Sequence, residues 1–259
     1  MTTSISPIVE VARRFAIDWL DRADTSVPPT IMTPGYVVHI GDVELEGLPA
    51  YTDGTVGQLR QFPGLGLTVH EVVTDGERLA LVFTEHGAST KHSGNAAAWS
   101  GVALFRWDGE RLVENWTQED YYARRRQLAE GVPDVIRPPA PAPWTTQPRS
   151  SDPGIERVVQ DWLAKPELDH VTVDDGRDSG LVLEVGSVEV LERFSAGDQV
   201  AFAAVWTGTY RGGLDDVPSG TDPVGLGVAG VLTVGSGGVV GGSIVTDRLG
   251  LRRRLLPPR

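Results

Sequence analysis

The chain of 259 residues contains no cysteine, which excludes disulfides, thiolate metal ligands and cysteine nucleophiles. Basic residues are outnumbered by acidic ones, 23 to 35, and the net charge of -12 argues against a nucleic-acid surface, since such surfaces are basic. No apolar run approaches the ~20 residues that span a bilayer, and the first residues lack the basic-then-apolar pattern of a secretory signal. We therefore expect a cytoplasmic protein with no nucleic-acid or membrane partner.

A proline-rich segment, Gly131–Pro153, divides the chain. It shows no apolar period, so it predicts a stiff, extended connection rather than part of a core. We therefore expect three parts: a first domain of residues 1–130, a linker of residues 131–153 and a second domain of residues 154–259.

The two halves share a series of short matches in the same order. Each half begins with an amphipathic helical pattern that ends in Asp-Trp-Leu, at residues 18–20 and 161–163. Gly-Val-Ala follows at residues 101–103 and again at 227–229. Near the ends, Asp120 pairs with Asp247 and Leu128 with Leu255, each at an offset of 127 positions. The ordered series predicts a diverged tandem repeat.

In each half the predicted helix is followed by strands. Asp75-Gly76 and Asp108-Gly109 stand between apolar runs and predict tight hairpin turns. Helices packed on one face of such an antiparallel sheet give an α+β domain, and a sheet that curls around a helix leaves a pocket at its open end. The strands expected in the first half are Tyr36–Ile40, Leu67–Thr74, Arg78–Thr84, Ala98–Trp107 and Arg111–Tyr121.

The last of these strands carries a family motif. Residues 111–128 contain a spaced set of five residues, namely Glu114, Trp116, Asp120, Gln127 and Leu128. This set resembles the closing strand of the SnoaL-like polyketide cyclases of the NTF2-like superfamily, and the resemblance spans about residues 8–130. The second half is similar more loosely, because it has Asp247 but carries Gly241 and Ser243 where the family has glutamate and tryptophan.

The resemblance implies two tandem NTF2-like domains, each a cone-shaped α+β fold with a curved antiparallel sheet wrapped on helices. Members usually pair their sheets as homodimers, and two fused halves would make this pairing internally, as a pseudodimer able to act as a monomer. The implied activity is cofactor-independent acid–base chemistry, of a cyclase or isomerase, on a small apolar organic or polyketide-like substrate. Two alternatives stay open: an epoxide-opening cyclase or hydrolase of the same fold, and a non-catalytic ligand-binding or accessory protein.

Asp120 is the first candidate catalytic residue, because the matching family aspartate points into the pocket and moves a proton. That role needs a carboxylate whose pKa rises in an apolar cavity, and Trp116, Tyr121 and Tyr122 would supply the apolar surroundings. The alternative is a solvated aspartate beside Glu119 at a strand end.

His39 and His86 are the other candidate catalytic groups, since the histidine pKa lies near neutral pH. Strand alternation places His39 on the face of Val37, opposite Val38 and Ile40, whereas the resemblance implies that it lines the pocket. The alternative for both is a hydrogen-bonded histidine within a strand or at its end.

The expected substrate-binding residues are aromatic: Trp19, Tyr36, Phe83 and Trp116. Ordinary core packing is the alternative for these side chains. In the second half Asp247 alone corresponds to a catalytic group, and its glycine-rich surroundings lead us to expect one main pocket, in residues 1–130. The acids at positions 42, 44 and 46 lack a histidine cluster, so we expect a solvated face and no metal. The resemblance implies that no cofactor is needed.

Overall fold

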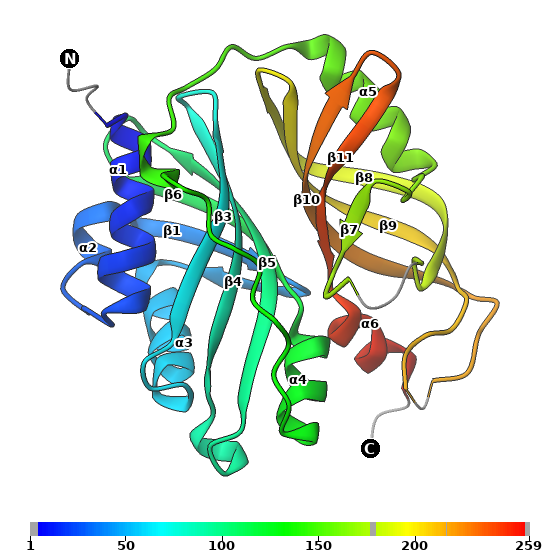
Figure 1. Cartoon of the computed structure of the whole chain (residues 1–259), viewed down its shortest axis with the longest axis horizontal. Helices are drawn as coiled ribbons and strands as arrows, with labels where there is room; N and C mark the ends of the chain where they lie inside the picture. Colours follow the sequence, from blue (N-terminus) through cyan, green and yellow to red (C-terminus); the bar gives the residue numbers. More distant parts are fainter. Residues whose placement is uncertain (1–4, 177–179, 216, 257–259) are drawn as a thin grey trace.

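The computed structural model describes residues 5–176, 180–215 and 217–256, and it has a mixed α+β fold with one sheet in each half (Figure 1). The first sheet has the strand order β2-β1-β6-β5-β4-β3, and all neighbours are antiparallel except β1 and β6. Its strands are β1 (Met32–Ile40), β2 (Val43–Glu46), β3 (Gly66–Thr74), β4 (Arg78–Ala88), β5 (Ala96–Trp107) and β6 (Leu112–Glu119).

Both predicted hairpin turns are present in this sheet. Gly76 between β3 and β4 and Gly109 between β5 and β6 have φ values of 98° and 102°, a region in which a side chain is disfavoured. The Asp108 carboxylate accepts hydrogen bonds from the backbone N–H groups of Glu110 and Arg111, which fixes the second turn.

Helices cover one face of the first sheet. The helix expected near the N-terminus is α1 (Pro7–Arg13), which continues as the π-helical segment η1 (Arg14–Asp21). It buries an apolar stripe that includes Val9, Phe15 and Trp19 against the sheet. The remaining helical segments of this half are α2 (Pro28–Ile31), α3 (Leu48–Gln61), the short η2 (Thr90–His92) and α4 (Tyr121–Glu130).

The second sheet has the order β7-β11-β10-β9-β8. Its strands are β7 (Val171–Val173), β8 (Leu183–Ala196), β9 (Gln199–Tyr210), β10 (Pro223–Gly235) and β11 (Gly238–Thr246), and its helices are α5 (Pro153–Ala164) and α6 (Arg248–Leu255). In both halves the last strand has a parallel neighbour from the start of that half, β1 or β7, and an antiparallel ladder on its other side. This common topology supports the repeat, which stays a prediction.

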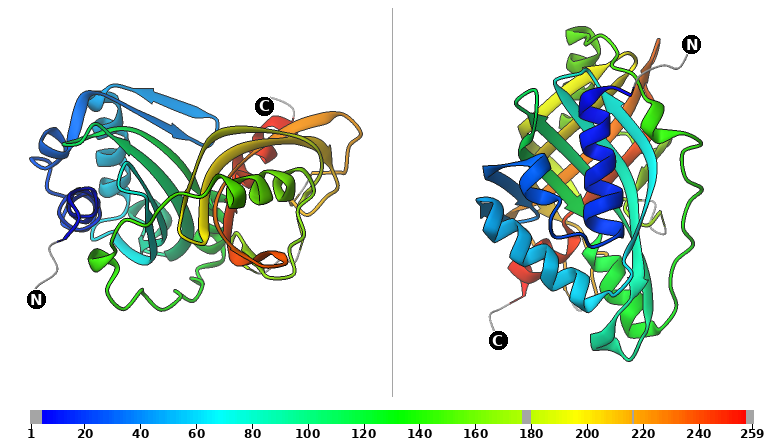
Figure 2. Two further views of the ribbon diagram at one scale, coloured as in Figure 1. Left: turned by 90° about the horizontal axis from the view of Figure 1, so that it is seen from above. Right: turned by 90° about the vertical axis from the view of Figure 1, so that its left-hand side faces the viewer.

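The two sheets pack face to face through an apolar cluster, on the side of the first sheet that its helices do not cover (Figure 2). Val82, Leu104 and Trp116 of the first sheet meet side chains of the second, among them Phe194 and Val231. The two sheets are therefore paired within one chain.

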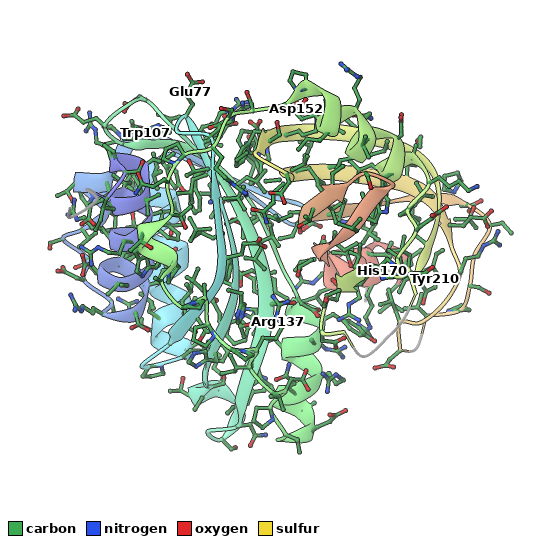
Figure 3. All side chains as sticks on the ribbon, turned by 45° about the horizontal axis from the view of Figure 1, so that its top comes forward. Glu77, Trp107, Arg137, Asp152, His170 and Tyr210 are labelled. Atoms are coloured by element: carbon green, nitrogen blue, oxygen red, sulfur yellow. The ribbon has the colours of Figure 1, made fainter. Side chains whose placement is uncertain are left out.

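The linker runs along the first sheet before it enters α5. Its backbone follows β3 through hydrogen bonds from Ala140 N to Val69 O (2.9 Å) and from Arg149 N to Thr74 O (3.0 Å), and it includes the short helix η3 (Pro143–Thr145). Arg137 lies between the two halves and donates to Ser243 Oγ in β11 (Figure 3). The segment thus has no core of its own, as its composition predicts, but it is held at several points.

Candidate functional site

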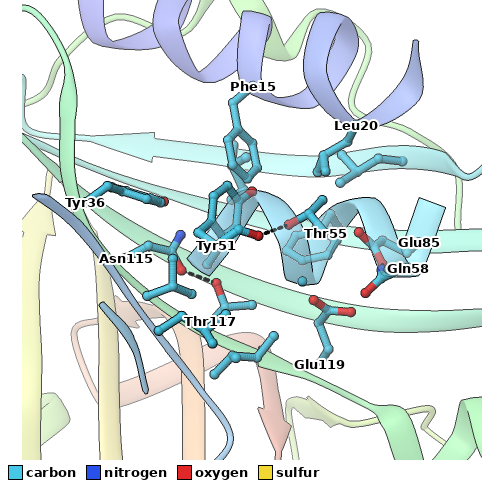
Figure 4. Close-up of a pocket in the computed structure, with 18 of the residues that line it drawn as sticks. Phe15, Leu20, Tyr36, Tyr51, Thr55, Gln58, Glu85, Asn115, Thr117 and Glu119 are labelled. Atoms are coloured by element: carbon cyan, nitrogen blue, oxygen red, sulfur yellow. Dashed lines mark hydrogen bonds between the residues drawn. The ribbon is translucent and has the colours of Figure 1, made fainter. Parts of the chain in front are cut away.

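A cavity of about 220 Å³ lies between the helix-covered face of the first sheet and helices η1 and α3 (Figure 4). Strand alternation decides which side chains reach it, because every second residue points to the same face. The residues that line it are Tyr36, Val38 and Ile40 from β1, Leu81, Phe83 and Glu85 from β4, and Asn115, Thr117 and Glu119 from β6. Phe15, Leu20, Tyr51 and Leu67 also line it and make its wall mostly apolar.

Two carboxyl groups meet at one end of this cavity. Glu85 and Glu119 are only 3% and 8% exposed, and their side chains are hydrogen-bonded to each other. Gln58 Nε2 donates to Glu85 Oε2 at 2.5 Å, and Trp99 Nε1 donates to Glu119 Oε2 at 2.7 Å. Figure 4 shows Gln58, Glu85 and Glu119 gathered on one side, away from Tyr36.

Burial raises the pKa of Glu85 well above its ordinary value, and the neighbouring charge of Glu119 raises this pKa further. Burial also raises the pKa of Glu119, while the hydrogen bond from Trp99 opposes that shift. Two carboxyl groups this close cannot both ionise easily, so the pair holds one proton over a wide range of pH. The hydrogen bond between the two side chains raises the pKa of Glu85 and lowers that of Glu119, which favours Glu85 as the group that holds the proton.

The first turn of α4 contacts the same pair. Tyr121 lines the cavity and its side chain is hydrogen-bonded to Glu119. The Arg124 guanidinium lies 4.1 Å from the centroid of the Tyr121 ring and 5.0 Å from that of Trp99. Its positive charge lowers the pKa of both glutamates and partly offsets their burial.

Tyr36 places a hydroxyl group in the cavity away from these carboxyl groups. The residue is 0% exposed, and its hydroxyl oxygen has no hydrogen-bond partner among the residues that the structure describes. Its ring meets that of Tyr51 edge to face at 5.2 Å, and the Tyr51 hydroxyl in turn accepts a hydrogen bond from Trp19 Nε1 at 3.0 Å. Burial raises the pKa of Tyr36 well above its ordinary value, so this phenol stays protonated.

The aromatic residues expected to bind substrate separate into two groups. Tyr36 and Phe83 line the cavity, whereas Trp19 lies behind its wall against Tyr51. Trp116 points to the other face of β6, where it stacks on the His39 ring at 5.2 Å and joins the contact between the sheets.

Neither histidine lines the cavity. His39 lies on the opposite face of β1, with Nδ1 2.9 Å from Glu44 and Nε2 3.0 Å from Glu114. His39 thus lies opposite Val38 and Ile40, as strand alternation predicts. It does not line the pocket, although the resemblance implies that it would. His86 Nε2 lies 3.1 Å from Thr68 Oγ1 on the neighbouring strand.

Asp120 does not point into the cavity, contrary to the expected position. Strand β6 ends at Glu119 and α4 begins at Tyr121, so Asp120 occupies the turn between them. Its Oδ1 accepts a hydrogen bond from Ala123 N at 3.0 Å and caps the helix, and its Oδ2 lies 2.5 Å from the Arg248 guanidinium of the second half.

Arg248 is the centre of a buried ion cluster between the halves. It is 3% exposed, and besides Asp120 it contacts Asp174 Oδ2 at 3.2 Å and Asp175 Oδ2 at 3.4 Å. Burial raises the pKa of Asp174 to about 7, although Arg248 lowers it. The carboxylate of Asp120 is therefore part of the interface between the two halves, and it does not reach the cavity.

The second half places Asp247 in the equivalent turn. Its carboxylate accepts a hydrogen bond from Gly250 N at 2.8 Å and caps α6. The core of the second half includes the buried aromatic side chains of Trp206, Tyr210 and Phe202. A pocket beside Arg248 and Leu226 holds only about 10 Å³.

The glutamate pair was missed by the sequence analysis, although a signal for one of the two residues exists. Glu85 continues the alternation of Leu81 and Phe83, and Glu119 continues that of Asn115 and Thr117. A carboxyl group at the end of an inward-facing apolar row is a pattern that would have identified Glu85, whereas the row before Glu119 is polar and gives no such signal.

Within residues 5–176, 180–215 and 217–256 no group of three or more histidine, aspartate or glutamate side chains is arranged to hold a metal ion. No helix in this part of the chain has the length and apolar character needed to cross a membrane.

Comparisons with known proteins give one family and a set of structural neighbours. The model of the SnoaL-like polyketide cyclase family matches residues 10–128. A candidate SnoaL-like polyketide cyclase from Jannaschia sp. CCS1 is 20% identical, with a TM-score of 0.46, and the match covers 50% of this chain and 97% of that one. AclR from Streptomyces galilaeus, a candidate hydroxylase, is 21% identical with a TM-score of 0.44, and the match covers 49% and 98% of the two chains. IdmH from Streptomyces antibioticus, a candidate polyketide cyclase, is 21% identical with a TM-score of 0.40, and the match covers 46% and 96%. No curated protein matches the sequence.

Proposed function

We propose that the chain is a cofactor-independent acid–base enzyme of the cyclase or isomerase type, and the match of the SnoaL-like polyketide cyclase family model to residues 10–128 supports this proposal. Its substrate is a small, mostly apolar organic molecule. The cavity of about 220 Å³ is smaller than the ~300–1,000 Å³ of pockets for drug-sized ligands, which favours a compact substrate over an extended polycyclic one.

The observation that supports this proposal most strongly is the glutamate pair in an apolar cavity. The Glu119 carboxylate is the general base that takes a proton from carbon, and the protonated Glu85 is the acid that returns one. Each group has a raised pKa, which brings proton uptake and release closer to neutral pH. Gln58 and Trp99 hold the two carboxyl groups in place.

Asp120 has no proton-transfer role in this proposal. Its carboxylate is held by Arg248 and by the start of α4. The residue before it, Glu119, lines the cavity, and Asp120 does not. We place the one active pocket in the first half, because the described part of the second half has a core packed with aromatic side chains.

The test uses a small ketone, because the natural substrate is unknown. Hydrogen–deuterium exchange at C4 of 2-cyclohexen-1-one, the γ-carbon conjugated with the carbonyl, is followed in D2O by proton NMR, with and without the protein. We expect Glu119→Gln to slow the protein-dependent exchange by about 10²–10⁴-fold, the usual contribution of a general base. Glu85→Gln should also slow it.

Glu114→Gln is the matched control, since Glu114 lies on the same strand but faces away from the cavity. Its exchange rate should equal that of the wild type. Full activity in Glu119→Gln would contradict the proposal. Binding of the ketone without any protein-dependent exchange would favour the ligand-binding or accessory role instead.

A further inference from the structure

The Tyr36 hydroxyl is a polar group for which the described part of the protein provides no partner. It is completely buried and lines the cavity. A buried hydroxyl without a hydrogen bond is unfavourable, so such a group in a cavity indicates a ligand that supplies the missing partner. In Figure 4 the Tyr36 hydroxyl points toward the middle of the cavity.

The surroundings of Tyr36 determine the kind of atom that fits there. The raised pKa keeps the phenol protonated, so its O–H is available as a donor. The nearby Tyr51 hydroxyl already accepts from Trp19 Nε1, and no lysine or arginine lines the cavity. A neutral acceptor oxygen is therefore favoured at this position over an anionic group.

The rest of the cavity determines the shape of the ligand. Between Tyr36 and the glutamate pair the wall is mostly apolar, with Val38, Leu81 and Phe83 in it. Along β6 it also carries Asn115 and Thr117, whose side chains are hydrogen-bonded to each other (Figure 4). A ligand that fills the cavity thus has an acceptor oxygen at one end and a hydrocarbon body that extends toward the carboxyl groups at the other.

We propose that the cavity binds neutral carbonyl compounds, with the carbonyl oxygen accepting a hydrogen bond from the Tyr36 hydroxyl. The catalytic role of Tyr36 rests on the proposed function, whereas the binding of the carbonyl group does not. When Glu119 removes a proton from a carbon conjugated with the carbonyl, negative charge moves to that oxygen, and the bond from Tyr36 becomes stronger. Tyr36 would then select the substrate class and stabilise the charge that develops.

The experiment compares two probes of similar size, cyclohexanone and methylenecyclohexane, which differ by an oxygen in place of a CH₂ group. Binding to the full chain is measured by NMR titration for the wild type and for Tyr36→Phe. We expect the wild type to prefer the ketone, and Tyr36→Phe to reduce this preference by about three- to tenfold, as the loss of one neutral hydrogen bond predicts. Affinity for the hydrocarbon should stay the same.

Tyr122→Phe is the control, because it removes a phenolic hydroxyl that lies outside the cavity. An unchanged ketone preference in Tyr36→Phe, or no preference in the wild type, would overturn the assignment. The result is independent of the exchange assay. A ketone preference that depends on Tyr36 in a protein without exchange activity would disprove the proposed enzyme and leave the binding assignment intact.

Discussion

Glu85 and Glu119 couple the protonation of the cavity to the stability of the fold. Above the ordinary glutamate pKa of ~4.3 the unfolded chain has released both protons, whereas the folded pair keeps one. The folded state then binds more protons than the unfolded state, so the free energy of unfolding falls as the pH rises, until the pH passes the raised pKa of the pair.

We therefore expect Glu85→Gln to be more stable relative to the wild type at pH 7 than at pH 4. Urea unfolding at a series of pH values measures this difference, and Glu114→Gln supplies the comparison for an outward-facing carboxylate on the same sheet. A difference between wild type and Glu85→Gln that does not change with pH would show that the pair holds no extra proton.

The residues of the site show which parts of it a sequence can predict. Alternation placed His39 on the face of Val37 and opposite Val38, because the period of a strand fixes the face, and Val38 is the one that lines the cavity. The pocket-lining position of Tyr36 came from the family resemblance. Glu85 was missed because β4 was expected to end at Thr84, whereas it runs to Ala88. Asp120 was chosen over Glu119 because it matches the aspartate of the family motif. In the structure β6 ends at Glu119, so Glu119 is the last residue of the row that faces the cavity and Asp120 lies in the turn after it.

At the scale of whole elements, α4 accounts for most of the difference between expectation and structure. Its three consecutive arginines give it no apolar stripe, so hydrophobic periodicity does not mark it. Helix α3 escaped prediction because it contains Gly54 and Gly57, which lower helix propensity. Tertiary contacts that no local pattern encodes hold both helices in place.

Asp120 caps α4 and is paired with Arg248, so we expect its replacement to destabilise the protein. A carboxylate isolated in an apolar cavity would give the opposite result, because its removal would leave stability unchanged or raised. Asp120→Asn keeps a side chain that can cap the helix but breaks the buried pair with Arg248. We expect a loss of about 3 kcal/mol, near the lower end for a broken buried ion pair, because Asp174 and Asp175 still face the guanidinium.

Asp247→Asn is the matched variant at the equivalent cap of α6. Its nearest cation, Arg254, lies 3.8 Å away and is partly exposed, so we expect a loss below about 1 kcal/mol. Chemical denaturation of both variants measures the two values. Equal losses would mean that the ion cluster around Arg248 adds nothing to the cap.

At the scale of the whole molecule, the halves share too much buried surface to unfold independently. Separating them would expose the apolar cluster around Leu104 and Val231 and would break the buried ion pair between Arg248 and Asp120. We expect one cooperative transition. Native-state hydrogen exchange checks this, because amides in β4 and β9 should open with the same free energy. A lower opening free energy for either sheet would show that one half unfolds alone.

The first two residues of α4 belong to different cores. Tyr121 lines the cavity of the first half, and Tyr122 packs in the core of the second half, where its hydroxyl accepts a hydrogen bond from Asp215 N at 2.8 Å. One residue inserted or deleted between Glu119 and Tyr121 would turn these side chains by about 100° around the helix axis. This junction therefore tolerates substitution far better than any change of length, and natural variants of the chain should vary in loop length elsewhere and keep the spacing from β6 to α4 constant.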